Sequence, residues 1–448
     1  MNTTTHTAWS SQTIKPIQDC RFCGSALRDV CIDLGVSPLC ESWLTASDLN
    51  KMEPFYPLHV YVCRQCHLVQ VNAYVSGEHI FGGDYAYFSS FSDSWLAHAK
   101  QYVNSAIERW KLNASSHVIE VASNDGYLLQ YFVKAGIPVL GIEPAANCAA
   151  AAKEKGVTSL CKFFGTKTAT ELRDQGVSAN LLLGNNVLAH VPDLNDFVSG
   201  LKILLASDGV CTLEIGYIKT MIEGNQFDSI YQEHYCYFSL LSIERVLAAH
   251  GLTVFDVEVL PTHGGSLRIY ARHDTDASKP ISQRVATLRQ EELDSGYTNL
   301  EIYRGFGQTA VRAKHRLLEL LIDLRRSGKQ VVGYGAPGKS ATLLNFCGIR
   351  EDLIAYTVDR NPYKHGRFMP GVRIPVFPVE KIRETRPDYV VILPWNLKDE
   401  IVCQLDYIKQ WGGKFVLPIP EATIWDPVSL LRQPRPNTIF PAVENCQN

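Results

Sequence analysis

The sequence predicts an α/β protein in three parts: a small N-terminal metal-binding domain, a central Rossmann-like domain and a C-terminal Rossmann-like domain. Two observations predict this layout. The first is a pair of Cys-x2-Cys motifs within the first 70 residues. The second is that two later stretches, starting near residues 117 and 331, each run strand, glycine turn, helix, strand and acid, which is the order of a nucleotide-binding βαβ unit. We place the parts at 19–80, 81–275 and 329–425, with a helical connector at 276–328.

Composition narrows the class of protein. The 448 residues leave room for roughly two to four domains, and 46% hydrophobic with 20% charged residues is a normal globular balance. A net charge of −3 gives no general electrostatic reason to bind nucleic acid or an anionic membrane. No apolar run approaches the roughly 20 residues of a spanning helix, and the Thr-rich start has no apolar signal core. The 13 scattered cysteines do not form a secreted disulfide framework, so we expect a cytoplasmic protein.

The N-terminal domain is expected to be built on a metal ion. Its two Cys-x2-Cys pairs each bring two thiolates to one ion, and together they complete a closed tetrahedral zinc site. Four sulfur ligands leave no open position, so the zinc is predicted to be structural. The small domain would need this metal to fold. The predicted ligands are Cys20, Cys23, Cys63 and Cys66.

The central domain starts with a hydrophobic strand at 117–122 and a turn at 123–126. A helix over 127–135 and a strand over 139–142 follow, ending in Glu143. The turn has one glycine, and Glu143 lies only 17 residues after it. This favours an adenosyl group without a pyrophosphate, with the acid accepting from the ribose hydroxyls. A strand at 181–183 then leads to a second polar turn. The predicted cofactor-binding residues are Ser123, Asn124, Asp125, Gly126, Glu143, Asn185 and Asn186.

An aromatic loop precedes this domain. Residues 85–92 read Tyr-Ala-Tyr-Phe-Ser-Ser-Phe-Ser. They fit either a packed linker or a lid whose Tyr85 and Tyr87 reach into a site, and the sequence alone leaves both open. A helix is expected over 94–110, with its apolar residues on one face.

A titratable cluster, Tyr231-Gln232-Glu233-His234-Tyr235, follows the nucleotide-binding unit. On a strand or tight turn, alternate side chains share a face, so Tyr231, Glu233 and Tyr235 would face one side and His234 the other. A histidine beside a carboxylate and phenols is a candidate proton-transfer group. The structural alternative is that His234 satisfies a buried carbonyl and Glu233 caps a helix that begins near Ser239.

The C-terminal domain carries the glycine spacing of a dinucleotide fold. Gly333, Gly335 and Gly338 precede a helix, and Asp359 lies 21 residues beyond Gly338. Taken alone, this pattern predicts NAD. Lys339 and Ser340 would instead be able to hold a nucleotide-sugar phosphate at the helix N-terminus.

Together these segments resemble the S-adenosylmethionine-dependent C-methyltransferases that act at C3 of nucleotide-linked deoxysugars. The likeness runs from about Cys20 to Pro420, and its central part corresponds to a class I methyltransferase domain. It rests on the cysteine pairs, Tyr-x-Tyr-x-Ser-Ser at 85–90, Asn-Asp-Gly at 124–126, Gly-x-Glu-Pro at 141–144, Asn185-Asn186 with His190-x-Pro192, Glu233-His234, His-Gly-Gly at 263–265, Gly-Tyr-Gly-Ala with Lys-Ser-Ala-Thr at 333–342, and Asn-Phe-Cys-Gly at 345–348.

The resemblance implies a reaction and assigns residues to it. A 4-keto-6-deoxysugar would lose its C3 proton to His234, and the enolate would take a methyl group from S-adenosylmethionine to give a branched sugar. Glu233 would orient the imidazole or hold a sugar hydroxyl. The C-terminal glycine loop becomes part of the sugar-nucleotide environment rather than an NAD site. Further predicted catalytic contacts are Tyr231, Tyr87 and His190. The predicted substrate contacts are Tyr85, His263, Gly335, Lys339, Ser340 and Asp359.

Two other functions remain open from sequence. One is a sugar O-methyltransferase that uses the same cofactor site. The other is an NAD-linked nucleotide-sugar oxidoreductase, or a nucleotide-binding regulatory module, built on the C-terminal domain. In each case the expected partner is a small nucleotide-linked sugar, not a nucleic acid or a membrane, and the chain is expected to be a monomer or a weak dimer.

Overall fold

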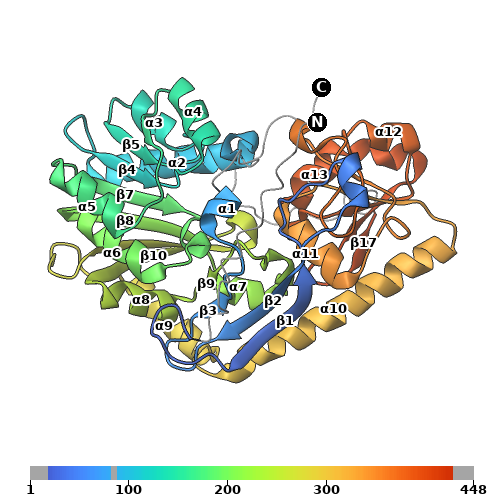
Figure 1. The fold of residues 1–448 in the computed structure, drawn as a ribbon, viewed down its shortest axis with the longest axis horizontal. Helices are drawn as coiled ribbons and strands as arrows, with labels where there is room; N and C mark the ends of the chain where they lie inside the picture. Colours follow the sequence, from blue (N-terminus) through green and yellow to red (C-terminus); the bar gives the residue numbers. More distant parts are fainter. Residues whose placement is uncertain (1–18, 82–87, 427–448) are drawn as a thin grey trace, which may run out of the picture.

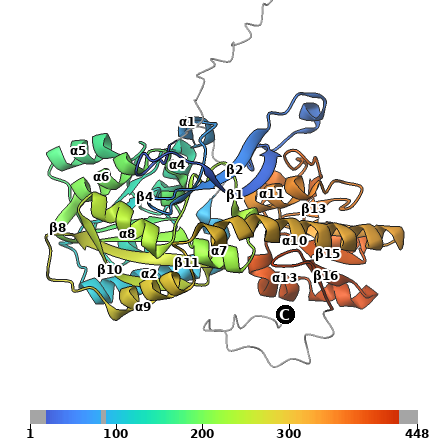
Figure 2. The same cartoon turned by 90° about the horizontal axis from the view of Figure 1, so that it is seen from below.

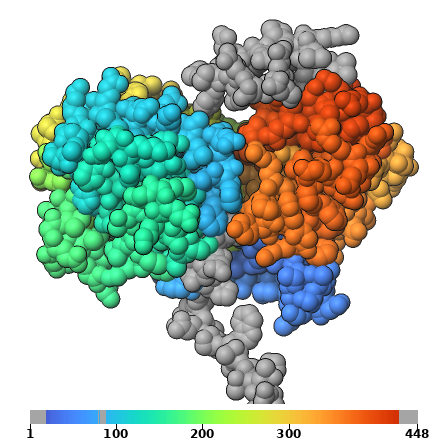
Figure 3. Space-filling view, turned by 90° about the horizontal axis from the view of Figure 1, so that it is seen from above, coloured from blue at the N-terminus to red at the C-terminus, as the bar shows by residue number. Residues whose placement is uncertain are grey.

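Three sheets organise the chain in a computed structural model that describes residues 19–81 and 88–426. Figure 1 shows the central sheet in the left lobe and the C-terminal sheet in the right lobe. The N-terminal sheet lies at the base between them. Figure 3 shows the same two lobes from above, with the dark-blue residues of the N-terminal domain lying against the C-terminal lobe, where Leu44 pairs with Phe368.

The central sheet has seven strands in the order β10-β11-β8-β7-β4-β5-β6. The five from β8 to β6 are parallel, and β10 and β11 add an antiparallel hairpin. β4 is wholly buried, as expected for a parallel strand covered on both faces. The strands are β4 (Val118–Val121), β5 (Val139–Ile142), β6 (Ser159–Leu160), β7 (Ala179–Asn185), β8 (Leu205–Gly216), β10 (Leu252–Leu260) and β11 (Ser266–His273).

Helices cover both faces of this sheet. The helix expected over 94–110 is confirmed as α2, and the Ser92 side chain accepts from the Trp95 N–H at its start (3.3 Å). The helix expected over 127–135 is shorter. The helices are α1 (Gly77–Phe81), α2 (Asp93–Trp110), α3 (Leu129–Lys134), α4 (Ala146–Glu154), α5 (Thr166–Asp174), α6 (Leu194–Leu204), α7 (Ile218–Glu223) and α8 (Leu240–Ala249).

The N-terminal sheet is antiparallel and takes its last strand from the central domain. Its order is β1-β2-β3-β9, in which β9 comes more than 160 residues after β3 along the chain. Val69 pairs with Tyr237, and Gln70 pairs with Cys236. The strands are β1 (Asp29–Ser37), β2 (Tyr56–Val62), β3 (Val69–Val71) and β9 (Cys236–Tyr237).

The C-terminal sheet has the order β14-β13-β12-β15-β16-β17, parallel except for β17. β13 is only two residues long, because the chain turns at residues 351–353 shortly before it. The elements are β12 (Val331–Tyr334), α11 (Gly338–Cys347), β13 (Thr357–Val358), β14 (Val376–Phe377), α12 (Lys381–Thr385), β15 (Tyr389–Ile392), α13 (Lys398–Gln404), β16 (Lys414–Leu417) and β17 (Thr423–Trp425).

Two helices connect the lobes: α9 (Gln283–Asp294) and α10 (Leu300–Arg326). α10 runs along the base of the C-terminal lobe (Figures 1 and 2). It buries one stripe at helical spacing, and this stripe packs into the same core as strands β1 to β3 and the C-terminal sheet. The stripe consists of Tyr303, Phe306, Ala310, Ala313, Leu317, Leu321 and Leu324.

The segment from 231 to 235 is a turn that leads into β9, not a strand. The expected alternation of faces is therefore wrong: the rings of Tyr231 and His234 lie 4.0 Å apart, centroid to centroid. The alternative in which Glu233 caps the helix that begins near Ser239 is also wrong. Glu292 of α9, not Glu233, accepts the N–H groups of Leu240 (2.6 Å) and Leu241 (2.9 Å).

In the described part of the chain, no helix combines the length and the apolar character needed to cross a membrane.

Glu292 provides a test of how the connector holds the central lobe. Its side chain is fully buried and also accepts from the Tyr217 hydroxyl (2.8 Å). Glu292→Ala leaves these donors unpaired, so we expect a loss of about 3 kcal/mol of unfolding free energy. Thermal unfolding followed by circular dichroism measures this. Glu291→Ala, on the exposed side of the same helix, is the control, and equal midpoints for the two variants would contradict the assignment.

Candidate functional site

The turn after β4 has a backbone shape that only a few residues adopt easily. Ala122, Asn124 and Gly126 all have positive φ angles (57°, 49° and 73°). A Cβ on Gly126 would lie 3.1 Å from Val157 Cγ2 and 3.2 Å from Ala152 Cβ. The single glycine of the turn is therefore required by a close approach of α4 as well as by its φ.

Glu143 fixes this turn from the end of β5. Its two carboxylate oxygens accept from the backbone N–H groups of Asn124 (2.9 Å) and Ala145 (2.8 Å). Burial raises the pKa of Glu143, opposed by these two hydrogen bonds. Each carboxylate oxygen keeps a further lone pair. The side chain can thus hold the loop and still accept from hydroxyl groups.

The polar side chains of the turn are tied to the segment before α2. The Ser89 N–H donates to Asn124 Oδ1 (2.9 Å). Lys155 Nζ bridges Asp125 Oδ2 (2.8 Å) and Ser90 Oγ (2.9 Å). The turn at 123–126 and the serines of the aromatic loop, Ser89 and Ser90, are therefore one hydrogen-bonded unit.

The other predicted cofactor residues lie at the same carboxyl edge of the parallel sheet. Asn185 Nδ2 donates to the Tyr127 hydroxyl (3.2 Å), and the Asn186 N–H donates to the Glu214 carbonyl (2.7 Å). Ser123 is buried beside Gly141, where a Cβ would come within 2.3 Å of Ser123 Oγ. The structure thus gathers all seven predicted cofactor residues at one edge, where parallel sheets bind ligands.

His234 is the centre of a second group of side chains. Its ring lies 4.0 Å from the Tyr231 ring and 4.6 Å from the His190 ring, centroid to centroid. His234 Nδ1 is 3.0 Å from the Ser229 carbonyl, so the Nδ1–H tautomer leaves a lone pair on Nε2. Burial lowers the pKa of His234 well below 6.5, and the charges of His190 and Lys339 act in the same direction.

Glu233 points into the N-terminal domain. Its side chain is 4% exposed, and Cys40 Sγ lies 3.4 Å from its Oε1. Burial raises the pKa of Glu233 to about 8, and the nearby Glu41 carboxylate adds to the effect. The carboxyl group is therefore largely protonated at neutral pH and is able to donate a hydrogen bond.

The C-terminal lobe adds a cation and aromatic groups. Lys339 Nζ lies 3.0 Å from Asn396 Oδ1 and 4.6 Å from the centroid of the Trp395 ring. The Trp395 indole N–H donates to Asp228 Oδ2 (2.7 Å), and Asp228 immediately precedes Ser229. We call Asp228, Tyr231, His234, His190, Lys339, Trp395 and Asn396 the junction cluster.

His263 approaches this cluster from the central sheet. It lies in the 3-10 turn η5 (Thr262–Gly264) with a φ of 55°, and its ring is 4.6 Å from the Trp95 ring. A Cβ on Gly264 would come within 2.7 Å of Trp395. The His-Gly-Gly motif therefore has a packing reason: the turn meets the C-terminal lobe at Trp395.

The remaining predicted substrate residues are engaged within the C-terminal lobe. Asp359 accepts from the N–H groups of Ala336 (2.7 Å) and Asn361 (2.8 Å). Ser340 is fully buried and donates to the Pro337 carbonyl (2.5 Å). A Cβ on Gly335 would lie 2.5 Å from Pro394 Cδ. Tyr85 and Tyr87 lie outside the described residues.

Protein atoms fill the space that the C-terminal glycines open. A Cβ on Gly338 would lie 3.1 Å from Cys40 Sγ of the N-terminal domain, and one on Gly333 would lie 2.8 Å from Thr357 Oγ1. The dinucleotide-like spacing is explained here by packing between protein segments, without a pyrophosphate.

The four predicted metal ligands come together. All four sulfur atoms of Cys20, Cys23, Cys63 and Cys66 lie within 4.8 Å of one another. The Cys20–Cys66 and Cys23–Cys63 pairs are both at 3.5 Å, near the ~3.8 Å separation of a tetrahedral ZnS4 site. Gln70 Nε2 donates to Cys20 Sγ (3.2 Å). The donor set fits a closed structural zinc site.

Several members of the junction cluster were not predicted. Trp395 and Asn396 follow β15, so their place after a parallel strand is a signal that could have identified them. Asp228 carries no such signal, because its position depends on the contact between two lobes. The contact between Cys40 and Glu233 was not foreseen either.

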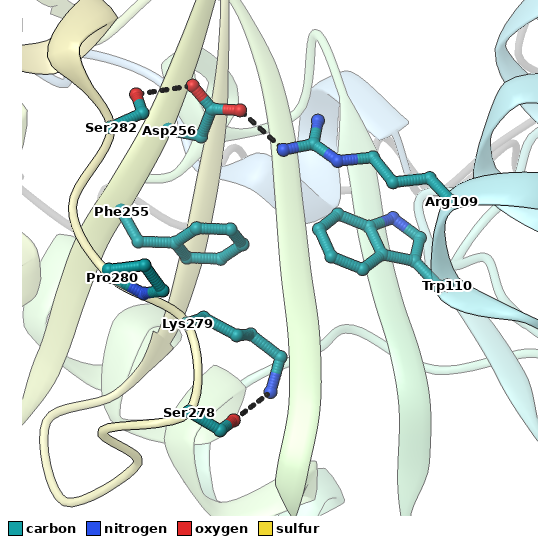
Figure 4. A pocket seen from close by; sticks show the side chains of 8 residues that line it. All are labelled: Arg109, Trp110, Phe255, Asp256, Ser278, Lys279, Pro280 and Ser282. Atoms are coloured by element: carbon teal, nitrogen blue, oxygen red, sulfur yellow. Dashed lines mark hydrogen bonds and ion pairs between the residues drawn. The ribbon is translucent and has the colours of Figure 1, made fainter.

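A surface hollow on the central lobe lies apart from these groups. Figure 4 shows Asp256 reaching Ser282 and Arg109 across it, and Arg284 also pairs with Asp256. Its charges are thus satisfied within the protein. The lining residues are Arg109, Trp110, Phe255, Asp256, Ser278, Lys279, Pro280 and Ser282.

Comparison with known proteins covers most of the chain. Residues 20–81 match a zinc binding domain family, residues 95–257 a methyltransferase domain family, and residues 261–420 the C-methyltransferase C-terminal domain family. The last of these begins inside the central sheet, earlier than the boundary we drew at 276.

Two relatives match this chain, one over most of its length and one over less than a third of it. C-methyltransferase NovU from Streptomyces niveus is 34% identical over 411 residues, 92% of this chain and 97% of that protein. Ubiquinone biosynthesis O-methyltransferase from Bartonella bacilliformis is 25% identical over 133 residues, 29% of this chain and 54% of that protein. Among solved structures, magnesium protoporphyrin IX methyltransferase from Synechocystis is 16% identical with a TM-score of 0.30, over 40% of this chain and 81% of that one.

Metal analysis tests the cysteine site. We expect one equivalent of zinc in the purified protein, lost in Cys63→Ser because a closed four-sulfur site does not tolerate a missing ligand. Because Gln70 joins Cys20 to the strand beside β9, metal loss should also weaken amide-exchange protection at Cys236. Cys161→Ser, an exposed cysteine outside the four, should keep its zinc. Folded protein without metal would contradict the site.

Proposed function

Because the chain belongs to the family of S-adenosylmethionine-dependent C-methyltransferases, we propose that it methylates C3 of a nucleotide-linked 4-keto-6-deoxysugar through an enolate. The observation that carries the proposal is the environment of His234. A neutral imidazole with one bound and one available nitrogen is held among phenol, imidazole and ammonium groups where two lobes meet.

The first step is removal of a proton from carbon. The C3–H bond breaks, the proton moves to His234 Nε2, and the electron pair passes into the enolate with charge on O4. The Ser229 carbonyl holds Nδ1–H, which fixes the tautomer and stabilises the imidazolium that forms. The enolate carbon then takes a methyl group that bound S-adenosylmethionine supplies from its sulfonium, and S-adenosylhomocysteine leaves.

The chain's own residues position the two reactants. Glu143 and the turn at 123–126 are suited to an adenosine group, and Asn185 and Asn186 share their edge of the sheet. Glu233, protonated in its buried site, would donate to a sugar hydroxyl, while Tyr231, His190 and His263 would contact the sugar. Alignment of carbon and methyl group within van der Waals contact is the main source of rate for such a transfer.

Structural zinc takes no part in these steps. A site of four sulfur ligands has no open position, so its contribution is to hold the N-terminal sheet.

His234→Asn tests the base. The amide keeps a donor for Ser229 but has no basic nitrogen, so we expect methyl transfer to fall by about 10²–10⁴-fold with unchanged S-adenosylmethionine affinity. Mass spectrometry of 4-keto-6-deoxyhexose nucleotides measures the gain of one methylene. His59→Asn, on β2 and paired with Asp33, is the matched control. Wild-type turnover in His234→Asn would remove His234 as the base.

The pH dependence follows from the direction of the His234 pKa. Because burial lowers this pKa well below the usual 6.5, the imidazole is neutral at neutral pH and becomes protonated only in acid. We therefore expect the acid limb of the rate profile to lie below pH 6.5. Solvent-deuterium exchange at C3 measures it directly, and the same exchange separates C-methylation from methylation of a sugar hydroxyl, which does not acidify that carbon.

A further inference from the structure

Lys339 lies one helical turn from a hydrogen bond that holds residues 230–235. This stretch carries His234, and we call it the base segment. It is in the first turn of α11, and Thr342, three residues later on the same helical face, donates to the Ile230 carbonyl (2.7 Å). Ile230 is four residues before His234. The helix therefore carries the ammonium group to the base segment and is hydrogen-bonded to it.

The ammonium group of Lys339 is positioned by neutral side chains and forms no ion pair with a carboxylate among the described residues. Its ammonium group contacts the neutral Asn396 side chain (3.0 Å) and the face of the Trp395 ring (4.6 Å). Among the described residues no carboxylate oxygen lies within 4.0 Å of it. Three N–H donors with one neutral acceptor leave capacity for an anion.

Asp228 holds Trp395 in place but does not form an ion pair with Lys339. It is fully buried, accepts from the Trp395 indole N–H (2.7 Å), and its Oδ1 has no partner among the described residues. Burial raises the pKa of Asp228 to about 6, against the pull of Lys339. Asp228 thus orients Trp395, on whose ring the ammonium rests, and remains beyond ion-pair distance.

The reaction needs such a cation. A base with a pKa well below 6.5 gives little driving force for removing a proton from carbon, so the developing oxyanion must be stabilised. The groups whose charges act on His234 are His190, His263 and Lys339. Tyr231 and Tyr237 flank its ring, and Asp228 precedes its carbonyl partner. Lys339 is the one lysine in this set; burial lowers its pKa, and the charge of Asp228 acts to raise it.

We propose that Lys339 is a catalytic residue, supplied by the C-terminal lobe, whose ammonium group binds the C4 carbonyl oxygen and stabilises the enolate. Asp228, Trp395 and Asn396 are positioning residues for it. The inference rests on the proposed function, because only an enolate places negative charge on O4. The other anion within the substrate is the diphosphate, and the two ligands predict different kinetics.

Lys339→Met removes the charge and keeps the side-chain length. With TDP-4-keto-6-deoxyglucose and its UDP and GDP counterparts as probes, and S-adenosylhomocysteine in the cofactor site, we expect C3 deuterium exchange to fall by about 10²-fold or more. KM should change little. The acid limb of the exchange profile should move to higher pH, because a positive charge no longer opposes protonation of His234. A purely structural defect would not produce that shift.

Two control variants separate the loss of the Lys339 charge from other effects of the substitution. Lys398→Met removes a second lysine of the same lobe, resting on the Trp425 ring (4.3 Å), and should leave exchange unchanged. Lys339→Arg keeps the charge and should keep the position of the acid limb. Wild-type exchange in Lys339→Met would overturn the proposal. So would a loss confined to KM together with weaker binding of TDP, which would assign Lys339 to the diphosphate. Absence of exchange in the wild type would instead overturn the enolate reaction itself.

Discussion

The pairing of β3 with β9 is the constraint on which the geometry of the candidate site depends. β9 begins two residues after His234, and its partner Gln70 also donates to a sulfur of the metal site. The same segment is held by the Val71 N–H, which donates to the Tyr235 carbonyl (3.0 Å), and by the Tyr235 N–H, which donates to the Ala189 carbonyl (2.7 Å). The turn that carries His234 is too short to fold by itself, and it is thus held by the small N-terminal domain on one side and the central sheet on the other.

The three domains meet in one polar region, and each contributes side chains to it. The N-terminal domain contributes Cys40, which contacts Glu233 and occupies the space where a Cβ on Gly338 would lie. The central domain contributes His190 and the base segment, and the C-terminal domain contributes Lys339 and Trp395. Burying so many polar groups is costly unless each is hydrogen-bonded. The extensive apolar contacts of α10 and the N-terminal strands supply stability away from this region.

Sequence predicted best what is local in the chain. The cysteine pairs, the turn at 123–126 and Glu143 are defined by short spacings, and backbone geometry alone brings their atoms together. Taken alone, the C-terminal glycine spacing predicted NAD. In the structure Gly335 and Gly338 pack closely against Pro394 and Cys40, and the spacing of glycines along the chain does not reveal such contacts. Asp228 and Trp395 are joined across 167 residues, so their partnership is a product of tertiary packing.

The chemistry and the architecture impose the same requirement. Shielding His234 from water keeps it neutral but weakens it as a base, since burial disfavours the imidazolium it must become. A weak base suffices only if the product anion is held strongly, and in a site of low dielectric a single oriented cation has a large effect. A cation brought by a separate lobe has a further consequence. On the proposed mechanism, proton abstraction uses His234 from one lobe and Lys339 from the other, so the contact between the lobes that buries the imidazole would also complete the site.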